Sequence, residues 1–167
     1  MMTLNWLAVA VTALVPLVVG AIYYHPKIAG NAWMKASGMT QEMIEGGNMA
    51  KILGLTFLMS LMLTFALMPI VIHQMSVFSL FAHDPSAMEP GTELNAYLND
   101  FMAKYGDNFR TFKHGAFHGF LTSVLLALPI LGIGSLFERR SGKYIFIHWG
   151  YWAVTLTVMG AILCGWS

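Results

Sequence analysis

The sequence predicts an all-α fold: an integral membrane bundle of four transmembrane helices, with short interfacial helices in the first and second connections. Two observations support this prediction. Hydrophobic residues make up 57% of the chain and charged residues only 10%, whereas a typical soluble domain has about 25% charged residues. The apolar residues also gather in four long runs, which one small water-soluble core could not bury. We therefore expect a single transmembrane domain over residues 1–167.

Each apolar run is long enough to cross the bilayer as a helix. The runs cover about 4–24, 49–73, 111–137 and 144–166, and roughly 20 helical residues span about 30 Å of hydrocarbon. Helices satisfy their own backbone hydrogen bonds in lipid. A β-barrel would instead need short segments of alternating polarity, so the continuous runs indicate helices.

The connections contain the signals of shorter helices. In the first connection, Pro26 suits the start of a helix and Gly38 suits its end, while Thr40 can cap the helix that follows. In the second connection, apolar residues recur at helical spacing over 92–105. We expect this amphipathic helix to lie on the outer membrane surface or to cover the bundle.

Lysine and arginine are distributed unevenly among the connections. The first (25–51) and third (138–143) together hold six, and the second (74–113) holds three beside five acidic residues. The positive-inside rule then predicts that the first and third connections are cytoplasmic, and that both termini and the second connection lie outside. The net charge is only +1 and nucleic-acid motifs are absent, so we expect lipid and no nucleic acid as a partner.

Aromatic and basic residues indicate where the spans meet water. Tryptophan and tyrosine are enriched at both membrane interfaces, and we expect five anchors there: Tyr23, Tyr24, Trp33, Trp149 and Trp166. Basic side chains beside the spans suit anionic lipid headgroups, and five are expected to contact them: Arg110, Lys113, Arg139, Arg140 and Lys143. His25 and His148 could also meet if the first and fourth spans pack together, although an aromatic belt explains that cluster without chemistry.

Three histidines and two neighbouring residues suggest a metal site at the outer face. His114 and His118 are four residues apart, so on a helix they share one face and could bind one ion together. His73 ends the second span and should lie at the same membrane level, with His83 and Asp84 in the adjoining connection. These residues could form a zinc-type or copper-type site. Alternatively, His73 and one of the pair could ligate a haem between helices.

A simpler interpretation competes with this one, because histidine, lysine and arginine collect at interfaces where their polar ends reach water. The chain contains no phosphate loop, nucleophile elbow or cysteine-metal motif. We therefore predict no catalytic residues and do not expect an enzyme. Three functions stay open: a structural or accessory component that self-associates or joins a larger membrane complex, a membrane protein that binds a metal or haem, and a small dimeric transporter.

Two stretches of the sequence resemble a known family. "YYHPKIAGNAWMKASG" combines an aromatic pair with Pro26, Gly30 and Trp33, and "LFERRSGKYIFIHWGYW" is followed by Met159 and Gly160. These motifs resemble the bacterial membrane family catalogued as domain of unknown function 1761. The resemblance implies a four-helix protein of the bacterial cytoplasmic (inner) membrane, and it implies no reaction.

Overall fold

The computed structural model describes residues 4–166, which form α-helices and short turns of related helix types. Four helices are long and apolar enough to span a membrane, and shorter helices lie between them, so the predicted fold class is confirmed. The long helices are α1 (Trp6–Tyr23), α4 (Met49–Val71), a third that runs through α7 (Phe112–Thr122), η3 (Ser123–Ala127) and α8 (Leu128–Phe137), and α9 (Gly142–Gly165).

The connections hold the shorter helices. The first contains η1 (Pro26–Gly30), α2 (Asn31–Ser37) and α3 (Gln41–Glu45), and the second contains α5 (Gln74–Leu80), η2 (Pro85–Ala87) and α6 (Glu93–Tyr105). Gly38 ends α2 in the left-handed conformation, Thr40 caps α3 and Thr92 caps α6. The short helices predicted in both connections are therefore present, and α5 and η2 are additional.

A polar side chain caps the start of each long helix. Asn5, Asn48, Thr111 and Ser141 each accept a hydrogen bond from the backbone N–H three residues further along. Such a bond satisfies a donor that the first helical turn leaves unpaired. These caps fix where each apolar run begins as a helix.

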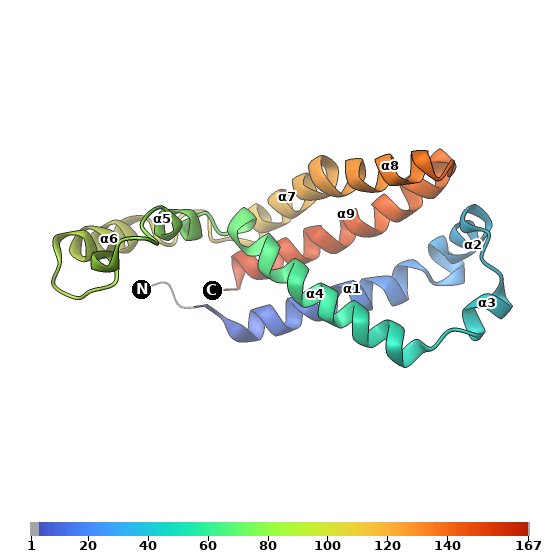
Figure 1. The fold of residues 1–167 in the computed structure, drawn as a ribbon, viewed down its shortest axis with the longest axis horizontal. Helices are drawn as coiled ribbons and strands as arrows, with labels where there is room; N and C mark the ends of the chain where they lie inside the picture. The colour runs from blue at the N-terminus through green and yellow to red at the C-terminus, as the bar shows by residue number, and fades with distance from the viewer. Residues whose placement is uncertain (1–3, 167) are drawn as a thin grey trace.

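The four long helices run back and forth along the molecule, so the start of the first and the end of the last lie at the same end. The start of α1 and the end of α9 are at the same end as α5 and α6, while α2, α3 and the turn between α8 and α9 are at the opposite end (Figure 1). The second connection therefore lies at the same end of the bundle as the start of α1 and the end of α9.

The buried core lies where α1, α4 and α9 meet. Its apolar side chains are Val9, Val15, Leu67, Met68, Val71, Ile72, Leu156, Met159, Leu163 and Cys164. The third span contributes little to it: Leu125, Ile130 and Leu136 are 72%, 63% and 67% exposed. In a membrane, side chains exposed in this way contact lipid.

The third span contains one wide turn at η3. The backbone N–H of Leu128 donates to the carbonyl of Ser123, five residues earlier, which is the bond of a π-helical turn. Pro129 follows and has no N–H to donate. The indole Nε1 of Trp149 on α9 donates to the same Ser123 carbonyl at 3.1 Å. This bond fastens the third span to α9 where the helix changes pitch.

Candidate metal centre

His73 lies in a short break between α4 and α5. The α4 helix ends at Val71, because Ile72 leaves the helical conformation with φ −112° and ψ 87°. Ile72 is buried in the core, and the amide Nε2 of Gln74 donates to the carbonyl of Asn108 at 2.8 Å. Residues fixed on both sides hold His73 at this break. The sequence predicted His73 as the last residue of the second span, and the helix ends two residues earlier.

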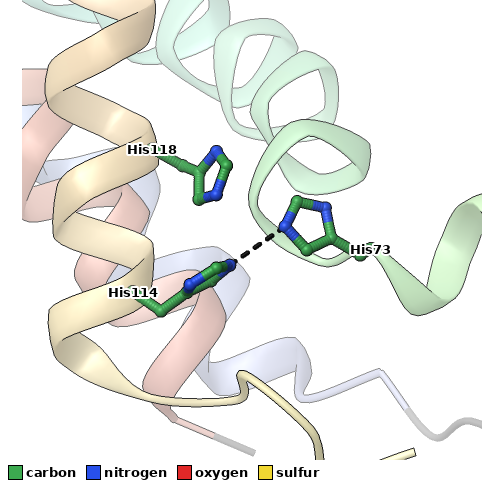
Figure 2. A group of neighbouring side chains, drawn as sticks. All are labelled: His73, His114 and His118. Atoms are coloured by element: carbon green, nitrogen blue, oxygen red, sulfur yellow. Dashed lines mark hydrogen bonds between the residues drawn. The ribbon is translucent and has the colours of Figure 1, made fainter.

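The other two histidines lie in the first turns of α7. The Thr111 hydroxyl accepts from the backbone N–H of His114 at 3.2 Å, and His118 follows one turn later. Four-residue spacing places both side chains on the same side of the helix. The α7 helix lies against α4 on that side (Figure 2).

Together the three imidazoles form a compact triad. His73 Nε2 lies 2.9 Å from His114 Nε2, with one ring donating and the other accepting. The ring centroids of His118 are 4.7 Å from His73 and 4.4 Å from His114. One nitrogen of each ring lies within 4.8 Å of the others, so the three could hold a metal ion, and Figure 2 shows the rings pointing into one space between the helices.

One face of α7 carries His114 and His118, and the adjacent face packs directly on α9. A Cβ at Gly119 would overlap the carbonyl of Leu156, and one at Gly115 would overlap Gly160 and Cys164. Glycine is the residue that lets two membrane helices approach so closely. We did not identify this contact from the sequence, although G-x-x-x-G at 115–119 was the available signal.

Phe109 covers one side of the triad from the loop before α7. Its ring centroid lies 5.1 Å from that of His114, and its φ of 63° is left-handed. Its carbonyl accepts from Cys164 Sγ at 3.3 Å and from the Thr111 backbone N–H at 2.9 Å. Sequence reasoning did not single out this residue, because the contacts that hold it come from distant parts of the chain.

The other two predicted ligands do not belong to the triad. His83 and Asp84 lie between α5 and η2, and neither is a member of the group of ligand atoms within 4.8 Å. The Asp84 carboxylate accepts from the hydroxyl and backbone N–H of Ser86 at 2.7 and 2.9 Å. These two bonds lower the pKa of Asp84 below its ordinary value, so the carboxylate is occupied locally as a cap of η2.

The predicted headgroup residues divide into two groups. Arg110 and Lys113 precede His114 in the sequence, and Arg110 also lines a small cavity with Trp166. At the other end, the Arg140 guanidinium donates to the Glu138 carboxylate at 3.3 Å and to the Ser37 carbonyl at 3.4 Å. Arg140 thus joins the first and third connections. Arg139 and Lys143 are exposed beside it.

The predicted interface anchors at the far end also make contacts between helices. Tyr23 Oη donates to the Ile147 carbonyl at 3.0 Å, and Tyr24 Oη lies 3.2 Å from His148 Nδ1. The Trp33 ring packs on Tyr24 at 5.4 Å between centroids. The first and fourth spans therefore do pack together, and the partner of His148 is Tyr24. The imidazole of His25 accepts from the Lys27 backbone N–H.

Comparison with known proteins identifies a family without an assigned activity. Neither the curated proteins nor the solved structures contain a match to this chain. A family model described as "Protein of unknown function (DUF1761)" matches residues 7–164, which include all three histidines of the triad. The resemblance predicted from the motifs of the first and fourth spans is thus confirmed. This multi-span membrane protein, whose apolar helices contact the lipid bilayer, belongs to the DUF1761 family.

Proposed function

We propose that this protein binds one transition-metal ion through His73, His114 and His118. The observation that carries the proposal is the convergence of three imidazoles, one from the break after α4 and two from α7, with one nitrogen of each within 4.8 Å of the others. A tetrahedral ion with bonds of about 2.0–2.1 Å would hold such nitrogens roughly 3.3 Å apart. Small rotations of the rings would reach this geometry from the positions they occupy.

A bare ion fits the triad better than a haem. A porphyrin between His73 and His114 would have to enter a separation of 2.9 Å between their Nε2 atoms. The His118 ring also borders that space. An ion needs only the room between the three nitrogens, so the geometry supports the metal alternative over the haem alternative.

Zinc is the ion that we propose. Imidazole suits Zn²⁺, Cu²⁺ and Ni²⁺, and three protein ligands with a fourth position for water or another molecule are typical of reactive zinc sites. All three ligands here are imidazoles, so the softer ions that prefer thiolate or thioether gain nothing from this site. Co²⁺ can replace zinc as a coloured probe of the same geometry.

Zinc affinity in single-histidine variants tests the proposal. We expect His73→Ala, His114→Ala and His118→Ala each to weaken Zn²⁺ binding by more than about 100-fold, because losing a group that only orients a ligand already costs 10–100-fold. The measurement is competition with a chelator, using metal-free protein purified in detergent.

The matched control is His83→Ala, which removes a histidine outside the triad from the connection that follows His73. It should bind Zn²⁺ as the wild type does. A wild-type protein that takes up no stoichiometric ion, or triad variants that bind as tightly as His83→Ala, would rule out the site.

The other functions predicted from the sequence stay predictions. The exposed apolar side of the third span, which includes Leu125 and Ile130, fits lipid as well as a second copy or a larger complex. We also propose that the four helices form one domain of a bacterial cytoplasmic membrane, with the second connection outside. The excess of Lys and Arg in the other two connections supports that orientation.

A further inference from the structure

A groove of about 370 Å³ lies beside the triad on the side of the second connection. It is formed by α5, α6 and the loop before α7, and most of its lining is apolar. The side chains that matter for the argument are His73, Val77, Phe101, Tyr105 and Phe109. Its volume is in the range of small-molecule sites, and the groove is open on one side.

The groove and the triad share walls. His73 lines the groove and lies 2.9 Å from His114 through its Nε2 atom. Phe109 also lines the groove, and its ring packs against that of His114. A molecule in the groove would therefore contact the same side chains that surround the ion.

The charges near the triad favour an anionic donor on the ion. Three neutral imidazoles leave the full charge of a divalent ion uncompensated, and the group contains no carboxylate or thiol among residues 4–166. Arg110 and Lys113 add positive charge at neighbouring positions of the chain. Opposite charge close to an ion in a partly desolvated site is strongly favourable.

We propose, building on the metal site proposed above, that the protein binds a small organic anion. Its donor group, such as a carboxylate or hydroxamate, binds the ion through one or two oxygens at the positions that the imidazoles leave open, and its apolar body lies in the groove against Phe101 and Tyr105. The body is an aromatic ring or a short acyl chain. An aromatic acid would come from solution, whereas an acyl chain would come from membrane lipid.

The experiment uses the Co²⁺-loaded full-length protein in lipid nanodiscs. Three hydroxamic acids, which bind metals as anions, share one head and differ in body: acetohydroxamic, benzohydroxamic and octanohydroxamic acid. Binding is followed through the visible spectrum of Co²⁺. We expect the benzo or octano compound to bind at least tenfold more tightly than the aceto compound, and the tighter of the two identifies the ring or the acyl body.

Variants of α6 separate the groove from partition into lipid. Phe101→Ala and Tyr105→Ala should each reduce the preference for the larger body at least threefold without changing affinity for Co²⁺ or for acetohydroxamic acid. Phe101→Leu keeps a large apolar side chain and should retain most of the preference. This variant keeps the test usable if Phe101→Ala misfolds. The control is Tyr97→Ala, because Tyr97 is on the same helix but lines a different depression, with Thr92 and Leu94.

Each outcome has one meaning. Equal affinity for all three compounds, or a preference that Phe101→Ala and Tyr105→Ala leave intact, would overturn this inference while the metal site stands. If Co²⁺ does not bind to the wild type, or binds equally well to His114→Ala, the proposed function is overturned and the anion site with it.

Discussion

Phe109 adopts a left-handed backbone conformation, with φ 63°, which bulky side chains rarely take. Such a conformation costs about 1–3 kcal/mol and persists where surrounding contacts determine it. Here the contacts are the hydrogen bond from Cys164 Sγ to the Phe109 carbonyl and the bond from Gln74 to the carbonyl of Asn108. The strained residue lies against His114, so strain is concentrated beside the proposed ligands.

Two substitutions at Phe109 measure that strain. Both Phe109→Ala and Phe109→Gly remove a ring that is 66% exposed, but only glycine adopts positive φ without steric cost. We expect the glycine variant to be more stable than the alanine variant by about 1 kcal/mol, measured as the free energy of unfolding in mixed micelles. An alanine variant of equal or greater stability would show that position 109 is not left-handed in the membrane.

At the scale of single residues, the sequence predicted the three proposed ligands but not the residues that surround them. The spacing of His114 and His118 and the place of His73 at the end of a span depend only on helical periodicity and span length. The left-handed Phe109 depends on hydrogen bonds from Gln74 and Cys164, which are distant in sequence. Local propensity would have favoured a smaller residue at such a position.

At the scale of single elements, α7 is the helix on which the site depends. Gly115 and Gly119 bring its backbone against α9, while His114 and His118, each one residue earlier, lie on the neighbouring side toward α4. Close contact on one face therefore fixes the rotation that presents the histidines on the next face. The G-x-x-x-G spacing is visible in the sequence, but which partner helix it contacts is a property of the folded bundle.

Alanine at two glycines of the third span tests this arrangement. A Cβ at Gly119 would overlap the Leu156 carbonyl, whereas one at Gly132 meets nothing within 4 Å. We expect Gly119→Ala to lower the free energy of unfolding by about 1–3 kcal/mol, as overpacking does, and also to weaken zinc binding. Gly132→Ala is the matched control and should be neutral or stabilising, because alanine favours helix.

That comparison has a clear opposing result. If Gly119→Ala and Gly132→Ala have the same stability and bind zinc equally well, α7 and α9 do not approach as closely as described. The positions of His114 and His118 would then need another explanation.

At the scale of the whole molecule, the hydropathy of the chain was sufficient to predict four long helices, because lipid imposes their length and polarity. It could not predict the break at Ile72 or the wide turn at η3. The break depends on burial of Ile72 and on the bond from Gln74, and the wide turn coincides with a bond from Trp149 on another helix. The arrangement places α5 and α6 toward one end of the bundle and α2 and α3 at the other (Figure 1).

Chemical labelling can assign these two ends to the two sides of the membrane. In a Cys164→Ala background, we expect Lys104→Cys on α6 to react with a membrane-impermeant maleimide in intact cells, and Lys35→Cys on α2 to react only after permeabilisation. The charge bias of the connections is the physical reason. Both positions reacting from the same side would contradict the four crossings, and the reverse pattern would contradict the orientation alone.

The separation of His73 and His114 along the chain has a consequence for the segment between them. An ion bound to both would join positions 41 residues apart and enclose α5, η2 and α6 in a closed loop. Closing a loop reduces the freedom of the chain within it. Binding of the ion would thus control how firmly the segment from α5 to α6 is held against the four long helices.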